Sequence, residues 1–183
     1  MTNAFELQSY FIKRIEKFVN SRDKHLIGWS EILKGGLAPS ATVMDWIGGA
    51  VKSASSGHDV VMSPSAYAYL DHYQSQNHAT EPWAIGQFLP LSKVYSFEPV
   101  PAELPPQFAA HILGAQGNLW TEYVASFKHV EYMAFPRMCA MAELTWSPKE
   151  SRNWENFSHR LQTHLQRLDE LSVNYRKISP ETK

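Results

Sequence analysis

The chain has 183 residues, of which 44% are hydrophobic and 19% charged, and its formal net charge at pH 7 is -1. This length can form one soluble globular unit with a substantial hydrophobic core. The near-neutral charge and the absence of a basic run argue against nucleic acid as a partner. No apolar stretch approaches the ~20 residues that a membrane-spanning helix needs, so we expect no membrane partner either.

The cysteine and histidine content predicts neither a disulfide nor a metal site. Cys139 is the single cysteine, which excludes an internal disulfide and a cysteine-rich zinc site, and its apolar neighbours predict a buried, unreactive thiol. The eight histidines show no ligand spacing. His159 and His164, for example, are five residues apart, so they do not share one face of a helix. We expect no metal and no other cofactor.

The first third of the chain alternates predicted helices with predicted strands. Apolar residues at helical spacing predict an amphipathic helix over residues 5–20. Short apolar runs predict strands over residues 25–32, 42–46 and 59–62, and a short helix is expected over residues 48–56. The apolar positions of the first helix are Leu7, Phe11, Ile15 and Phe18.

The middle of the chain is less regular. Residues 66–74 are predicted as a helical turn or loop. Residues 75–108 hold many of the eleven prolines and show no strong period, so they are predicted as a long excursion. A short apolar run over residues 111–116 predicts a fourth strand.

The C-terminal part is predicted to be helical. The apolar segment 129–144 predicts a buried helix with a kink at Pro136. Residues 147–150 have capping-box spacing with proline at the first helical position, and a long amphipathic helix follows. Its apolar positions are Trp154, Phe157, Leu161, Leu165, Leu168 and Leu171. We therefore predict a folded part over residues 1–175 and a frayed C-terminal tail over residues 176–183.

Short apolar strands that alternate with helices predict an α/β fold with a parallel sheet. Four strands are predicted, whereas a closed (β/α)8 TIM barrel needs eight strands and about 250 residues. The chain is therefore either a small open α/β sheet or half of a barrel. Its chemically interesting residues lie at the C-terminal ends of the strands, where barrel enzymes place their sites, which favours the half-barrel. These residues are Trp29 and Glu31, Trp46, Tyr69 and Asp71, and Trp120 and Glu122.

The most informative segment is 113–122, where Trp120 and Glu122 lie two positions apart. In an extended backbone, side chains at that spacing point the same way. An indole can cover the apolar face of a sugar ring while a carboxylate accepts hydrogen bonds from its hydroxyls. The alternative is an ordinary core tryptophan beside a solvated glutamate, and similar chemistry at three other strand ends favours the sugar-binding interpretation.

Five motifs in chain order resemble the second half of the catalytic barrel of β-N-acetylhexosaminidases, the glycoside hydrolases of family 20. The resemblance covers nearly the whole chain and continues through Pro136–Glu143 and Trp146–Pro148. It implies an enzyme that removes terminal β-linked N-acetylglucosamine or N-acetylgalactosamine with retention, the substrate's own acetamido oxygen being the nucleophile. The five motifs are Leu26–Leu33 (LIGWSEIL), Val43–Trp46 (VMDW), Gly57–Pro64 (GHDVVMSP), Tyr69–Asp71 (YLD) and Gly114–Glu122 (GAQGNLWTE).

The resemblance also implies roles for six residues. Trp29, Trp46 and Trp120 would wall the acetamido pocket, and Trp120 would also stack on the sugar ring. Tyr69 would donate a hydrogen bond to the acetamido carbonyl and hold it for attack on C1. The carboxylates of Asp71 and Glu122 would bind the remote ring hydroxyls. The implied ligand is therefore a glycan that contains N-acetylhexosamine.

The sequence departs from the family pattern in ways that bear on activity. The family's catalytic Asp–Glu pair and its sugar-clamping arginine have no counterpart, since the only Asp–Glu, Asp169–Glu170, lies in the last helix as a solvated pair. Ser30 stands where the family usually has aspartate, which we expect to affect packing, and the turn 47–50 looks short. We therefore expect the isolated chain to be inactive, and to self-associate or to pair with a missing N-terminal half.

Other interpretations stay open. Glu31 is expected to be structural, bonded to neighbouring strands or loops. Trp83, Phe88 and Tyr95 could line an outer sugar subsite or form a hydrophobic cluster. The whole chain could instead be a non-catalytic carbohydrate-binding module, or a structural partner that completes a barrel.

Overall fold

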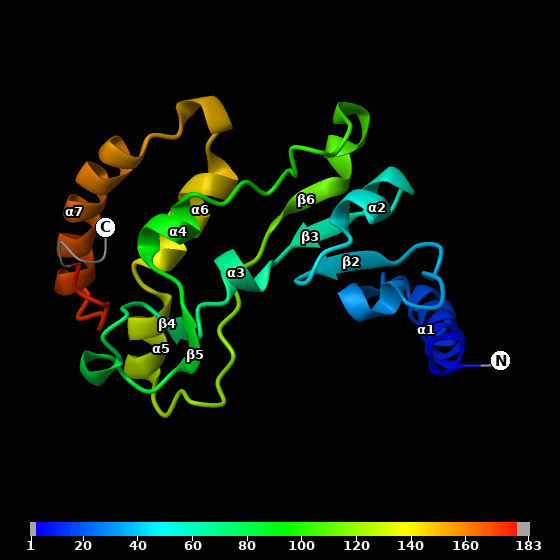
Figure 1. Cartoon of the computed structure of the whole chain (residues 1–183), viewed down its shortest axis with the longest axis horizontal. Coiled ribbons are helices and arrows are strands. Elements are labelled where there is room, and N and C mark those ends of the chain that lie inside the picture. The colour runs from blue at the N-terminus through cyan, green and yellow to red at the C-terminus, as the bar shows by residue number, and fades with distance from the viewer. Residues whose placement is uncertain (1–2, 179–183) are drawn as a thin grey trace. The chain divides into compact units, whose positions relative to one another are not determined.

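The computed structural model describes residues 3–178, which form two compact units (Figure 1). Within the described range, the first unit contains residues 3–64 and 99–115, and the second contains residues 65–98 and 116–178. Each unit is therefore built from two separate stretches of the chain. No helix within the described range has both the length and the apolar character that crossing a membrane requires.

The first unit contains a four-stranded parallel sheet in the order β1-β2-β3-β6. Figure 1 labels three of these strands side by side. Val43 and Val60 are register partners on neighbouring strands, and both are fully buried. Among residues 3–178, β1 pairs only with β2 and β6 only with β3, so each outer edge has no strand partner. The strands are β1 (Ile27–Trp29), β2 (Thr42–Asp45), β3 (Val60–Met62) and β6 (Ile112–Ala115).

The sheet confirms the predicted α/β class with four parallel strands. The first strand is shorter than predicted, because Ser30–Leu33 form the 3-10 helix η1. The predicted short helix is present as α2 (Ala50–Ser55), and the 3-10 helix η3 (Pro106–His111) precedes β6.

Helix α1 (Ala4–Asn20) also belongs to the first unit and matches the predicted helix. The side chain of Asn3 accepts a hydrogen bond from the Glu6 N–H at 2.9 Å, which caps the first turn. Glu6 in the first turn and Lys17 in the last turn complement the helix dipole. These local features explain why the helix forms at this position.

The second unit contains short elements that the sequence pattern did not predict. Residues 66–74 were predicted as a helical turn or loop, but they end in the two-residue strand β4 (His72–Tyr73), preceded by α3 (Ser65–Ala68). Strand β4 pairs in parallel with β5 (Ile85–Phe88). Helix α4 (Leu91–Tyr95) and the 3-10 helix η2 (His78–Thr80) also lie within the predicted excursion.

The C-terminal helices correct two predictions. The predicted kinked helix is two helices, α5 (Phe127–Ala134) and α6 (Arg137–Trp146), because Pro136 has no N–H to continue the helical ladder. Helix α7 (Trp154–Glu170) is capped by Asn153, not by the predicted capping box, which lies around the 3-10 helix η4 (Lys149–Ser151).

The predicted tail over residues 176–183 lies partly outside the described range, since residues 179–183 are not described. Its first residue, Arg176, donates from Nε to Glu81 Oε1 at 2.8 Å. The backbone N–H of Arg176 also donates to the carbonyl of Phe135 at 3.1 Å. The chain is therefore fixed to the second unit up to at least this residue.

Candidate functional site

Four of the six predicted site residues lie on two segments of the second unit that are hydrogen-bonded to each other. Tyr69 follows α3, and Trp120 lies two residues after Asn118. The Leu70 N–H donates to the Asn118 carbonyl at 2.6 Å, and the Asn118 N–H donates to the Ala68 carbonyl at 2.7 Å. This backbone pairing brings the Tyr69 and Trp120 segments side by side.

The rings of Tyr69 and Trp120 are in contact. Their centroids are 6.1 Å apart with an interplanar angle of 60°, an edge-to-face arrangement that aromatic pairs favour. The Trp120 side chain remains 40% exposed, so part of the indole is accessible to a ligand. A phenol hydroxyl and an indole face thus lie together at this surface.

Asp71 lies two residues beyond Tyr69 and is buried. Burial raises the pKa of its carboxyl group, and the charge of Glu122 raises it further, while a backbone hydrogen bond and Arg137 act in the opposite direction. Among residues 3–178, Asp71 Oδ1 has no hydrogen-bond partner. A buried acceptor without a partner costs free energy, so this oxygen is suited to accept a hydrogen bond from a ligand.

Arg137 binds the carbonyls on both sides of Asp71, and no sequence motif pointed to this charged residue. It is fully buried. Among residues 3–178 its two Nη atoms donate to four backbone carbonyls, and its Nε has no hydrogen-bond partner. Burial lowers its pKa to about 9, against the attraction of Glu81 and Asp71. The one signal for it in the sequence is an arginine within the otherwise apolar run Met133–Met141.

Trp29 and Trp46 lie in the first unit, at the ends of neighbouring strands. Trp29 is the last residue of β1, and Trp46 directly follows β2. The Trp46 indole Nε1 donates to both carboxylate oxygens of Glu31, at 3.2 and 3.1 Å. This contact confirms the prediction that Glu31 is bonded to a neighbouring strand or loop, and it fixes the orientation of the Trp46 ring.

Ser30, which departs from the family pattern, is buried in the same region. Its hydroxyl donates to Asp45 Oδ1 at 2.8 Å and accepts from the Trp46 N–H at 3.2 Å. Asp45 also accepts from the backbone N–H groups of Gly48 and Ala50. Ser30 therefore packs within the turn that carries Trp46, in line with the expected role in packing.

Two of the aromatic residues considered for an outer sugar subsite, Tyr95 and Trp83, have different surroundings in the structure. Tyr95 packs against Trp154 and Phe157, with ring centroids 5.3 and 4.6 Å away, so the hydrophobic-cluster alternative holds for it. Trp83 is 69% exposed, and its ring lies in an edge-to-face arrangement with Tyr123, with the ring centroids 6.0 Å apart. Trp83 and Tyr123 help to line a hollow of about 590 Å³ in the second unit.

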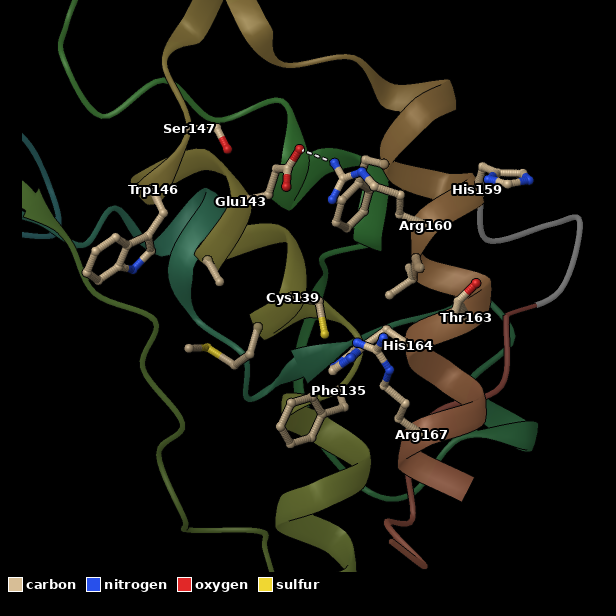
Figure 2. Close-up of a pocket in the computed structure, with 14 residues that line it drawn as sticks. Phe135, Cys139, Glu143, Trp146, Ser147, His159, Arg160, Thr163, His164 and Arg167 are labelled. Atoms are coloured by element: carbon tan, nitrogen blue, oxygen red, sulfur yellow. Dashed lines mark hydrogen bonds and ion pairs between the residues drawn. The ribbon is translucent and has the colours of Figure 1, made fainter. Parts of the chain in front are cut away.

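A larger hollow of about 790 Å³ lies between α6 and α7 in the second unit (Figure 2). It contains none of the predicted site residues. Glu143 pairs with Arg160 across it at 2.5 Å, and Cys139 points into it. Cys139 is partly buried, not fully buried as predicted. Desolvation raises the pKa of its thiol to about 11, so the thiol stays protonated at neutral pH, in line with the predicted low reactivity. Within residues 3–178 no group of acidic, histidine or cysteine side chains is arranged to hold a metal ion.

The chain is similar in sequence to known glycosidases. The family model for the catalytic domain of glycosyl hydrolase family 20 matches residues 1–149. A beta-hexosaminidase of Porphyromonas gingivalis is 49% identical over 184 residues, which cover 99% of this chain and 24% of that protein. A beta-hexosaminidase of Akkermansia muciniphila is 35% identical over 143 residues, which cover 75% of this chain and 28% of that protein. The chain thus spans about a quarter of the length of these relatives.

Solved structures give the same result for the fold. The family 20 exo-β-N-acetylglucosaminidase of Vibrio harveyi, in complex with N-acetylglucosamine, matches with a TM-score of 0.83 at 36% identity. The match covers 96% of this chain and 28% of that one. The fold therefore corresponds to part of the catalytic TIM barrel of that family.

Proposed function

The chain belongs to glycoside hydrolase family 20, and from this we propose that it is the C-terminal half of a β-N-acetylhexosaminidase barrel. In this proposal it carries residues that bind the N-acetylated sugar, but not the catalytic Asp–Glu pair. The observation that carries the proposal is the contact of Tyr69 with Trp120, beside the unpartnered oxygen of buried Asp71. Aromatic faces, a phenol donor and carboxylate acceptors are the groups that recognise an acetamido sugar.

Each of these residues has a role in binding. The Trp120 indole stacks on the sugar ring, and the Tyr69 hydroxyl donates to the acetamido carbonyl. Asp71 Oδ1 and the Glu122 carboxylate accept hydrogen bonds from ring hydroxyls.

In the complete reaction, the acetamido oxygen attacks C1 of the terminal sugar as the glycosidic bond breaks, and water then opens the intermediate with net retention. The Tyr69 hydrogen bond would hold the acetamide close to C1, so that the attack is effectively intramolecular. The leaving oxygen needs a proton from a general acid, which the family resemblance places outside this chain. The isolated chain should therefore bind the sugar without cleaving it.

The open edges of the sheet support the half-barrel interpretation. Strands β1 and β6 each lack a second partner among residues 3–178, and the apolar side chains of α1 are exposed. Unpaired strand edges and exposed apolar helix faces are seldom left uncovered in a soluble protein. We propose that the remaining strands of the barrel cover them, whether as part of one longer chain or as a separate partner.

A second candidate function is a carbohydrate-binding module without catalysis. It shares the acetamido-binding residues and differs only in having no partner that supplies the acid. Addition of the N-terminal part of a related hexosaminidase separates the two, because activity would be restored only in the first case.

Titration with N-acetylglucosamine tests the binding proposal directly. Tryptophan fluorescence or NMR of the purified chain should show a response on the order of millimolar affinity, and glucose, which lacks the acetamide, should give none. Tyr69→Phe should weaken the response to N-acetylglucosamine, because the hydroxyl donor is lost while the ring is retained. An equal response to both sugars, or no response, would refute the proposed site.

A further inference from the structure

The buried guanidinium of Arg137 binds four backbone carbonyls and so joins three parts of the second unit. It donates from Nη1 to the carbonyls of His72 and Leu89, both at 3.0 Å. It donates from Nη2 to the carbonyls of Leu70 at 2.5 Å and Met133 at 2.7 Å. One side chain on α6 thus holds the end of α5, the segment that contains β4, and the residue that follows β5.

Two of the four carbonyls flank Asp71. Leu70 and His72 are its immediate neighbours in the chain, and both turn their carbonyl oxygens towards Arg137. The N–H of Leu70 is meanwhile bound to the Asn118 carbonyl. The backbone that carries Tyr69 and Asp71 is therefore held between Arg137 on one side and the Trp120 segment on the other.

A buried cation is a costly way to hold a backbone. Burying a charge is unfavourable, and an apolar side chain of similar size in such a place is often equally or more stabilising. Arg137 makes no direct ion pair among residues 3–178, and the nearby Glu81 is bonded to Arg176 and Tyr132. The groups that Arg137 satisfies are backbone carbonyls, so its distinctive contribution is the geometry of the chain around Asp71.

We propose that Arg137 is a positioning residue for the sugar site, fixing the backbone of residues 70–72 so that the Tyr69 hydroxyl and the Asp71 carboxylate are held in place for the ligand. This inference rests on the proposed function, because it assigns Arg137 to the same site. The guanidinium is planar and presents five N–H donors in a fixed fork. A lysine ammonium is a compact point charge with three donors, and it does not span four carbonyls in this geometry.

The test compares two arginines of the same unit. Arg137→Lys keeps the charge and removes the fork. Arg152→Met is the matched control, because Arg152 also joins distant parts of the unit, donating to the Ser147 carbonyl and to Glu98, both at 3.1 Å, and contacts none of the sugar-site residues. Thermal melts identify a temperature at which both variants are folded, and the measurements are made at that temperature. Arg137→Met is measured as well, and if it does not fold, Arg137→Lys carries the test.

The first measurement is affinity for N-acetylglucosamine in the full chain. Arg137→Lys should weaken it about tenfold, since a small displacement of positioned groups has effects of at least that size. Arg152→Met should change it by less than about twofold, as expected for a distant, independent site. Equal losses in both variants, or unchanged affinity in Arg137→Lys, would overturn the proposal.

The second measurement does not require sugar binding. Amide hydrogen exchange in Arg137→Lys should accelerate at Leu70, Ile85 and Leu89, whose N–H groups are bonded to the Asn118, Asp71 and Tyr73 carbonyls, while exchange in α7 stays unchanged. Acceleration spread evenly over the second unit would mean that Arg137 is merely structural. If the unaltered chain fails to bind N-acetylglucosamine, the proposed function fails, and the exchange pattern still decides the role of Arg137.

Discussion

Helices α1 and α7 are alike in local design and opposite in packing. Each has 17 residues, an asparagine cap that accepts a backbone hydrogen bond, a glutamate in the first turn and a basic residue in the last turn. Helix α7 buries its apolar side within the second unit. The buried residues are Phe157, Leu161, Leu165 and Leu168.

Helix α1 buries polar residues instead. The Ser9 hydroxyl donates to the Gly36 carbonyl at 2.6 Å, and Glu16 Oε1 accepts from the N–H and the hydroxyl of Ser40 at 2.6 and 2.8 Å. Its apolar residues face outward, with Phe11 and Phe18 each 60% exposed. Local sequence thus determines that both helices form, whereas it does not determine what covers the apolar face of α1. We propose that another part of the barrel or a second copy of the chain covers it.

The largest expected effect is the difference between α7 and α1 in how far a substitution lowers the free energy of unfolding. Leu165→Ala removes a buried side chain of α7 and should lower the free energy of unfolding by about 2–5 kcal/mol. At a concentration low enough for the chain to be monomeric, Phe11→Ala in α1 should change it by no more than about 0.5 kcal/mol, as for other exposed positions. Chemical denaturation followed by circular dichroism measures both. A comparable loss from Phe11→Ala would mean that the α1 face is packed in solution.

Acid should destabilise the unit that contains α7. Burial lowers the pKa of His72 to about 4, assisted by the charges of Arg137 and Lys93. Between about pH 6.5 and pH 4 the unfolded chain binds a proton that folded His72 does not bind, so stability falls as the pH falls through this window. Solvent screening should keep the loss below the roughly 3 kcal/mol that the whole shift would give.

His72→Gln is the control for that pH dependence, because glutamine does not titrate. The variant should show a flatter stability profile between pH 6.5 and pH 4, measured by denaturation at several pH values. Asp71 acts in the opposite direction, since its pKa is raised in the folded chain. An unchanged slope in His72→Gln would mean that His72 is not the group that titrates.

The polar attachment of α1 can be broken separately. Glu16→Ala removes the acceptor for both Ser40 donors and should cost about 1.5–3 kcal/mol, the usual range for hydrogen bonds to a charged group. Because α1 has little else buried, we expect faster amide exchange in α1 with little change in α7. Uniform exchange through both helices would contradict the claim that Glu16 is a main attachment of α1.

The smallest effect concerns association. We expect the chain to self-associate through exposed apolar surface, and Phe11→Ser combined with Phe18→Ser should weaken association by about tenfold, or roughly 1.4 kcal/mol. Light scattering at several concentrations measures this. A compact monomer at high concentration, before any substitution, would contradict the half-barrel interpretation.

Sequence periodicity predicted the elements that are long or strongly apolar. Helices α1 and α7 and the four strands of the sheet appear where the pattern placed them, within a few residues. Strands β4 and β5 and helix α4 were missed, because they lie in residues 66–108, where the sequence shows no strong period. The apolar stripe of α1 forms as predicted, but the local sequence does not show that its side chains would be exposed.

The candidate site shows the same limit. Family resemblance placed Tyr69 and Trp120 in one site, and the structure brings their rings together. Arg137 was not predicted, because three of the four carbonyls that it binds belong to residues far from it in the chain. Asn153 was not predicted as the cap of α7, because residues 147–150 also match the capping-box pattern.

The decisive assay is hydrolysis of an aryl N-acetyl-β-glucosaminide by the purified chain, alone and after mixing with the N-terminal part of a family 20 barrel. We expect no appreciable turnover by the chain alone, since loss of a general acid typically costs about 10²–10⁴ in rate. We expect turnover to be restored in the mixture, and this restoration to be lost when Phe11 and Phe18 are replaced by serine. Turnover at ordinary enzyme rates by the chain alone would show that the proton donor lies within these 183 residues and would refute the half-barrel interpretation.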